Sequence, residues 1–147
     1  MLVDILKNLF EKDLNRLQKE IELYKDEKVL WIVDKHIANS AGNLCLHLIG
    51  NLNAYIGAAI GKTNYIRNRE LEFSSKDISK AELIENIEKI KIIIASALDA
   101  LTEEQLENDY PILVFEKKTS TAYFLVHLTT HLSYHLGQIN YHRRLLD

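Results

Sequence analysis

The scarcity of residues that interrupt regular structure most limits what this chain can fold into. Its 147 residues include one proline, Pro111, and five glycines. Because proline and glycine are the commonest breaks in helices and strands, a chain so poor in them is expected to form long helices. No short-period repeat or low-complexity linker divides it, so residues 1–147 are expected to form a single domain.

Apolar residues recur at spacings of three and four, which is the period of an amphipathic helix. Ser79 with Glu82 three residues later predicts a capping box at one helix start. The predicted helices run from Leu2 to Tyr24, from Asn39 or Ser40 to Gly61, from Ser79 to Leu101, and from Thr119 or Ser120 to Leu145. Four such helices can bury one another's apolar stripes, so the expected fold is an all-α four-helix bundle.

Two connections between these helices are expected to be long and partly extended. Residues Arg69 to Phe73 alternate polar and apolar side chains, which is typical of a short strand. Residues Ile112 to Phe115 are apolar and follow Pro111, which pushes Tyr110 away from helical geometry. The bundle is therefore predicted to have long crossover connections.

The net charge and the cysteine content limit which partners the protein can bind and in which cellular compartment it is expected. With 18 Lys+Arg against 21 Asp+Glu the net charge is −3, which argues against a nucleic-acid partner. No stretch approaches the ~18 consecutive apolar residues of a membrane span. A single cysteine, Cys45, cannot form an internal disulfide, which suits a reducing compartment. We therefore expect a cytoplasmic protein that binds neither nucleic acid nor membrane.

Three of the six histidines lie four residues apart on the last predicted helix: His127, His131 and His135. A step of four returns to within ~40° of the starting direction, so two neighbouring rings can grip one metal ion. Zinc proteases use the same spacing, but their motif has a glutamate beside the first histidine, where this chain has Leu132. For a single pair, ordinary packing histidines are as good an explanation as metal ligands.

A further histidine, His47, interrupts an apolar run from Leu44 to Ile49 on the second predicted helix. A buried imidazole needs hydrogen-bond partners, and Asn43 and Asn51 lie one turn before and after it. This polar stripe faces the expected core and indicates a site rather than packing alone.

Two segments carry a resemblance to a known family. They are Ser40-Ala-Gly-Asn-Leu-Cys-Leu-His47-Leu-Ile-Gly50-Asn51-Leu52 and His131-Leu-Ser-Tyr-His135-Leu-Gly137-Gln138-Ile139, and His131 follows His47 by 84 positions. Together they are similar to the paired signatures of the DinB/YfiT superfamily of four-helix proteins, which are proposed metalloenzymes. The resemblance implies a DinB-like bundle in which His47, His131 and His135 bind one divalent nickel, zinc or iron ion.

Three neutral imidazoles would leave at least one coordination position open, as catalytic sites do. Each ligand ring also needs a partner for its second nitrogen. Helical spacing makes these residues the candidates for that outer layer: Asn43, Asn51, Tyr134 and Gln138. The resemblance implies three ligands, so His127 is expected to lie beside them rather than to be a fourth.

The other notable residues have simpler expected roles. His142 is interpreted as structural, His36 as meeting water, and Cys45 as a buried apolar residue pointing away from the metal. Trp31 is expected to close one end of the core. In the crossover, the candidate substrate contacts are Tyr65, Arg67 and Arg69.

The resemblance implies a metal-dependent enzyme acting on a small molecule. Relatives of this type include transferases that join bacillithiol, mycothiol or glutathione to electrophiles, and proposed hydrolases. Because no acidic residue adjoins the predicted ligands in sequence, thiol transfer is ranked above hydrolysis. The competing hypothesis is a non-enzymatic binding bundle with a vestigial metal site. The resemblance implies a homodimer under either hypothesis.

Overall fold

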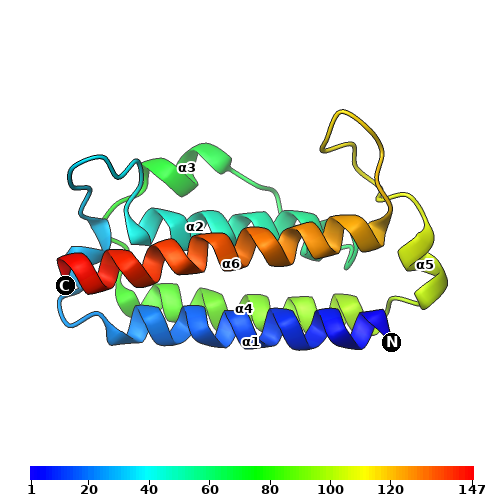
Figure 1. Ribbon diagram of the computed structural model, residues 1–147, viewed down its shortest axis with the longest axis horizontal. Coiled ribbons are helices and arrows are strands. Elements are labelled where there is room, and N and C mark those ends of the chain that lie inside the picture. The colour runs from blue at the N-terminus through cyan, green and yellow to red at the C-terminus, as the bar shows by residue number, and fades with distance from the viewer.

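The computed structural model describes residues 1–147 and consists of helices and their connections, which confirms the all-α fold class. Four long helices lie side by side (Figure 1). They are α1 (Leu2–Leu23), α2 (Ala41–Leu52), α4 (Lys80–Asp99) and α6 (Thr121–Leu146). Two short helices, α3 (Arg69–Ser74) and α5 (Glu103–Glu107), lie in the connections.

The order of the helices makes one connection unusually long. Figure 1 shows that α2 and α4 run in the same direction, while α1 and α6 run the opposite way. The chain therefore has to return along the length of α2 before α4 can begin. This crossover, residues 59–79, carries α3 and packs it against α2.

The core is built from the apolar stripes of all four long helices. On α1 the fully buried side chains are those of Leu6, Phe10, Leu14, Leu17 and Ile21, which recur every three or four residues. This face packs against α4 and α6. Burying it removes the apolar side chains from water, which is the main favourable term in folding.

Serine side chains mark the starts of three long helices. Ser40, Ser79 and Ser120 each accept a hydrogen bond from the backbone N–H three residues further on. The predicted starts are confirmed, but at Ser79 only this half of the capping box forms. The complete box lies at the start of α5, between Thr102 and Gln105, where no helix was predicted.

The end of the second predicted helix differs from a regular α-helix. The α-helical bonds stop at Leu52, and a π-helical segment, η2 (Asn53–Ala58), follows. There Ala59 N–H donates to the Ala54 carbonyl at 3.1 Å, and Gly61 N–H donates to the Ile56 carbonyl at 2.9 Å. These bonds reach back five residues, so the helix widens near its end.

The predicted extended segment at Arg69 to Phe73 is wrong. Residues Arg69–Ser74 form α3, because the Asn68 side chain accepts from Leu71 N–H at 3.2 Å and so caps a helical turn. Residues 112–115 form no strand, with bends at Ile112 and Phe115. The only bridge nearby joins Asp109 to Ser120 on either side of them.

The connection before α2 contains a 3-10 helix, η1 (Glu27–Trp31). The Trp31 ring packs over the start of α2, where an ideal Cβ on Gly42 would lie 2.7 Å from it. Trp31 is half-buried and packs against the core at that end of the bundle. None of the helices has both the length and the apolar composition needed to cross a membrane.

Candidate metal centre

Three histidine side chains from two helices meet in the middle of the bundle. His47 projects from α2, and His131 and His135 project from consecutive turns of α6. The Nε2 atoms of His47 and His131 are 3.2 Å apart, and those of His131 and His135 are also 3.2 Å apart. One nitrogen from each ring lies within 4.8 Å of the other two. His47 is buried, and the other two are partly buried.

Hydrogen bonds at the far side of two rings fix which nitrogens carry protons. His47 Nδ1 lies 3.0 Å from Glu72 Oε1, and His135 Nδ1 lies 2.7 Å from Gln138 Oε1. Carboxylate and amide oxygens accept here, and Glu72 Oε1 lies closer to His47 Nδ1 than Arg67 Nη2 does at 3.3 Å, so we assign both Nδ1 atoms as donors. In the neutral rings, the lone pairs of both Nε2 atoms therefore point at His131 Nε2.

Burial favours the neutral form of these rings. It lowers the pKa of His47 below its ordinary value, although the hydrogen bond to Glu72 acts in the opposite direction. Burial, followed by the charges of the neighbouring histidines, lowers the pKa of His131 to about 4. Lowered pKa values favour the neutral rings near pH 7, and the neutral ring is the form that binds metals.

The donor set fits one divalent cation. At a metal–nitrogen distance of about 2.0–2.1 Å, tetrahedral ligand nitrogens lie about 3.3–3.4 Å from one another. The two pairs that include His131 are close to this at 3.2 Å, and all three nitrogens lie within 4.8 Å of one another. The His47 and His135 lone pairs cannot both receive a proton from His131 Nε2. Moreover, His131 Nδ1 is buried without a hydrogen-bond partner, so no protein group draws this ring away from the centre. A shared cation would satisfy all three Nε2 atoms.

Glu72 of α3 supplies the carboxylate that holds His47. The Glu72 side chain is buried, and Arg67 donates to it twice, from Nε to Oε2 and from Nη2 to Oε1, both at 2.9 Å. Such a two-pronged pair fixes the carboxylate plane. Burial and hydrogen bonding leave Glu72 little freedom except to orient the His47 ring.

Two features of α2 let α3 come this close. An ideal Cβ on Gly50 would lie 2.0 Å from Glu72 Oε2, so only glycine leaves room for the carboxylate. One turn before His47, the Asn43 side-chain amide donates to the backbone carbonyls of Glu72 at 3.0 Å and Ser75 at 2.8 Å. Asn43 therefore anchors α3 and does not touch a histidine ring.

The other predicted outer residues lie in different surroundings. Gln138 accepts from His135, as described above. Asn51 is buried, and its Oδ1 has no hydrogen-bond partner. The His127 ring is 6.4 Å from that of His131 and 4.9 Å from that of Phe115. His127 is outside the group whose nitrogens converge. Tyr134 is 65% exposed, and its ring lies 5.2 Å from that of His135.

Two histidines stand apart from the centre. His142 is buried, and its Nε2 donates to the Ile32 carbonyl at 2.9 Å while its Nδ1 lies 2.7 Å from the Tyr24 hydroxyl. Both ring nitrogens are satisfied, so His142 links α6 to α1 and to the following loop. His36 is exposed. Cys45 is fully buried, and burial raises the pKa of its thiol to about 12.

Of the three crossover residues predicted to contact substrate, Arg67 instead holds Glu72 and also lies over the Tyr55 ring. Arg69 lies over the Phe73 ring. Phe73 in turn covers His47, at 4.9 Å between ring centroids.

Sequence reasoning missed Glu72. The local sequence did hold a signal, because Asn68 followed by Glu70 and Glu72 is typical of a helix start with acidic residues in its first turn. That pattern would have predicted α3. It would not have revealed that Glu72 meets His47, which lies 25 residues earlier.

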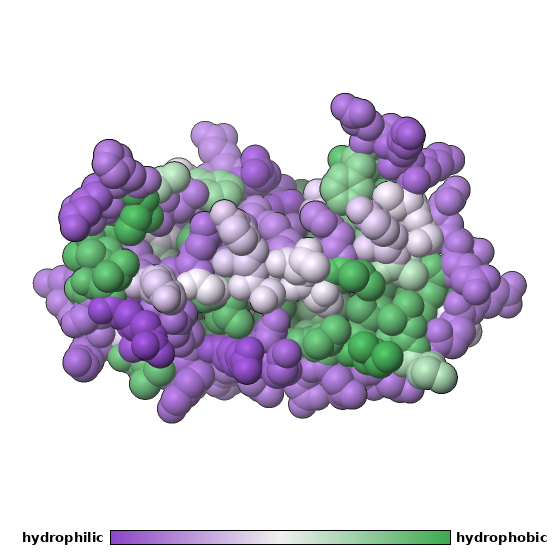
Figure 2. Space-filling view, viewed as in Figure 1, coloured by the Kyte–Doolittle hydropathy of each residue, from purple (hydrophilic) through white to green (hydrophobic).

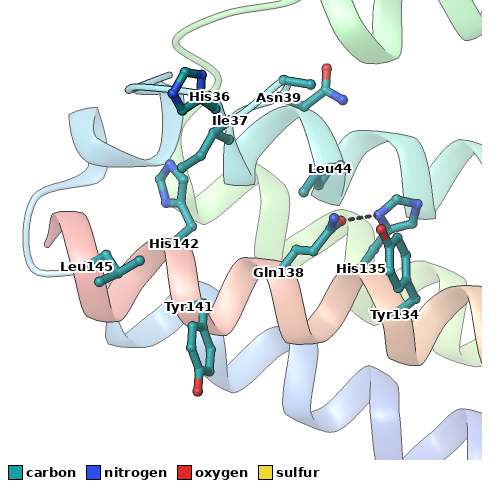
Figure 3. A pocket seen from close by; sticks show the side chains of 11 residues that line it. His36, Ile37, Asn39, Leu44, Tyr134, His135, Gln138, Tyr141, His142 and Leu145 are labelled. Atoms are coloured by element: carbon teal, nitrogen blue, oxygen red, sulfur yellow. Dashed lines mark hydrogen bonds between the residues drawn. The ribbon is translucent and has the colours of Figure 1, made fainter.

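A cavity of about 520 Å³ opens beside His135 (Figure 3). Residues 36–39 and Leu44 of α2 form one side, and the carboxyl-terminal half of α6 forms the other. Figure 3 shows Tyr134, His135 and Gln138 together at one end, with His36 and Leu145 toward the other. Of the three converging histidines, only His135 lines this space, which has the size that small-molecule sites usually have.

These features define an all-helical protein with a three-histidine group able to hold a metal ion. The chain belongs to the DUF1572 family, a family of proteins of unknown function, whose model matches residues 2–147. No curated protein matches the chain.

Proposed function

We propose that this protein is a cytoplasmic, DinB/YfiT-like enzyme that depends on a divalent metal ion and acts on a small molecule. His47, His131 and His135 would hold the ion, which would be nickel, zinc or iron. Two observations support this proposal: the three rings converge inside the bundle, and the two sequence signatures quoted above resemble those of that superfamily.

The observation that carries the proposal is the direction of the lone pairs. Glu72 and Gln138 accept from the Nδ1 atoms of His47 and His135, which leaves both Nε2 atoms facing His131 Nε2. A hydrogen-bonded packing cluster would pair donors with acceptors. Here the Nε2 lone pairs of His47 and His135 both face His131 Nε2, which can donate to only one of them, whereas a shared cation would satisfy both.

When bound, the ion would supply Lewis acidity, which lowers the pKa of a thiol or a water molecule. Glu72 keeps the His47 lone pair aimed at the centre, and Gln138 does the same for His135. Phe73 excludes water from one face of the His47 ring. Imidazole ligands suit zinc, iron and nickel alike, so the donor set does not choose among them.

We place thiol transfer before hydrolysis. Hydrolysis would gain from a carboxylate free to take a proton from water. Glu72 is the carboxylate that reaches the site, and both of its oxygens accept from Arg67 while one also accepts from His47. It is therefore a positioning group. A low-molecular-weight thiol such as bacillithiol would be the co-substrate.

The test is metal analysis of untagged protein, followed by spectroscopy of the Co²⁺-loaded form. We expect one ion per chain, loss of that ion in His131→Ala, and retention in His36→Ala, which removes an exposed histidine. Stoichiometric metal in His131→Ala would disprove the site. A sulfur-to-cobalt charge-transfer band on adding thiol would support transfer. If this band is absent and the protein hydrolyses an ester or an amide, the hydrolase would be favoured.

A homodimer is the second part of the proposal. The first halves of α1 and α6 expose apolar side chains, including Ile5 (49% exposed), Tyr123 (61%) and Val126 (44%). The helices α1 and α6 pack together, and Figure 2 shows a green, hydrophobic area at the N-terminal end of α1. Contiguous apolar surface of this kind is typical of protein contacts. The alternative to the proposed enzyme is a non-enzymatic binding protein that forms the same dimer and has a vestigial metal site. The metal analysis described above distinguishes the two.

A further inference from the structure

The cavity beside His135 has a lining that limits what it can bind. Eleven residues line it, and none of them is Asp, Glu, Lys or Arg. The chain as a whole carries 18 Lys+Arg and 21 Asp+Glu among 147 residues. A charged ligand entering this space would lose water without meeting an opposite charge, which is unfavourable. The lining therefore selects for uncharged molecules.

The body of the cavity is apolar and aromatic. Its lining includes Ile37, Ala38 and Leu44 from the loop and α2, and Tyr141 and Leu145 from α6. Figure 3 shows Ile37 and Leu44 on the side opposite α6. Aliphatic and aromatic surfaces of this kind gain most from covering an apolar or aromatic ligand. With about 520 Å³, the space accepts a molecule of several fused or linked rings.

Two polar side chains, those of Tyr134 and Gln138, lie at the end of the cavity next to His135, while His36, Asn39 and His142 line other parts of it. Gln138 uses its Oε1 to accept from His135, which leaves its side-chain amide N–H groups as donors. The Tyr134 hydroxyl lies at the same end (Figure 3). The Gln138 amide and the Tyr134 hydroxyl beside His135 are therefore suited to donate to an acceptor oxygen on the ligand, such as that of a carbonyl group.

We propose that this cavity binds an uncharged, largely apolar carbonyl compound, with its carbonyl oxygen directed toward Gln138 and Tyr134 beside His135. This inference names the chemical class of the molecule on which the proposed enzyme would act. Its relevance to catalysis rests on the proposed function. An anionic thiol would then reach the centre by another approach. Binding itself requires only the cavity.

Prodan, an uncharged naphthalene ketone whose emission shifts to shorter wavelength in apolar surroundings, is a suitable probe. We expect it to bind once per chain, to both metal-free and Zn²⁺-loaded protein. Its anionic counterpart, anilinonaphthalene sulfonate, should bind at least about tenfold more weakly. Equal binding of the anionic dye, or no saturable binding of prodan, would overturn the proposal.

Blocking variants show whether the dye occupies this cavity. Ala38→Trp should weaken prodan binding by about tenfold or more. Asn39→Phe is a second blocking variant with the same expected effect, and it covers the case in which the new tryptophan side chain turns toward solvent. Ala81→Trp, at an exposed position of α4 outside the lining, should leave it unchanged. Prodan binding unaffected by both blocking variants would place it elsewhere and disprove the inference. Metal content, measured on the same samples, reports separately on the proposed function.

Discussion

A methyl group at position 50 and the Glu72 carboxylate would occupy the same space, since an ideal Cβ on Gly50 falls 2.0 Å from Glu72 Oε2. The buried carboxylate is also held by Arg67, so it cannot simply swing aside. The closeness of α2 and α3, and with it the orientation of His47, therefore depends on the absence of a side chain at position 50.

Gly50→Ala is expected to weaken metal binding by about 10–100-fold, because it displaces the group that orients His47. Overpacking should also lower the free energy of unfolding by about 1–3 kcal/mol. Metal titration and urea unfolding measure the two effects. The matched control is Gly137→Ala in α6, where a Cβ meets nothing within 4 Å. It should raise stability by about 0.5–1 kcal/mol. Equal metal affinity in both variants would contradict the role of Glu72.

Glu72→Ala removes the acceptor for His47 Nδ1–H and is expected to lower metal affinity by about 100-fold. Glu72→Gln keeps an acceptor oxygen near His47 Nδ1, so its metal affinity should fall by only about tenfold. Either change leaves the Arg67 guanidinium half-buried without its anion, so stability should fall by about 3 kcal/mol. Competition with a chelator gives the affinities. Glu70→Gln, an exposed change on the same helix, serves as the reference. If Glu72→Gln bound the metal more weakly than Glu72→Ala, this explanation would be refuted.

Cys45 predicts a loss of stability in alkaline solution. Burial raises the pKa of its thiol from 9.0 to about 12, so above pH 9 the unfolded chain releases this proton while the folded chain keeps it. The free energy of unfolding then falls as pH rises, by about 1.4 kcal/mol per pH unit from this group. In Cys45→Ala the fall between about pH 9 and 11, measured by urea unfolding, should be shallower by that amount. Buried Tyr24, whose pKa is also raised, contributes equally in both proteins. Identical slopes would show that Cys45 ionises in the folded state.

The apolar surface on α1 and α6 predicts which substitutions separate the two subunits of the proposed dimer. Ile5→Glu or Val126→Glu would place a charge in the contact and should give monomers in analytical ultracentrifugation. Ile92→Glu, at a side chain of α4 that is 72% exposed, should leave the dimer intact. A natural chain that is monomeric at every concentration would exclude this interface.

Local signals explain why the helices were predictable. The serine caps at positions 40, 79 and 120 depend on hydrogen bonds to residues three positions away, so the sequence alone predicts them. The buried stripe of α1 follows from spacing in the same way. Position Leu52, where α2 changes to π-helical bonds, has no comparable sequence signal.

Non-local contacts explain what was missed. Helix α3 has six residues, too few to be stable alone, and Asn43 holds it in place from a distant part of the chain. The spacing of His131 and His135 predicted that they share a face, but the meeting with His47 followed only from the family resemblance. The role of Glu72 could not be predicted, because the alternation of polar and apolar residues from Arg69 to Phe73 suggested an extended segment. In an extended segment, successive side chains point to opposite faces, so the placement of Glu72 would differ from that in the helix.

The crossover between α2 and α4 ties the candidate centre to a connection that lies outside the four long helices. It holds Arg67 and Glu72, and it also presents exposed Lys62 and Arg69, where trypsin cuts. To be cleaved, such a segment must first open, and opening would withdraw Glu72 from His47. Resistance of this stretch to trypsin should therefore rise when the histidines are loaded, so digestion can serve as a reporter of occupancy that needs no knowledge of the substrate.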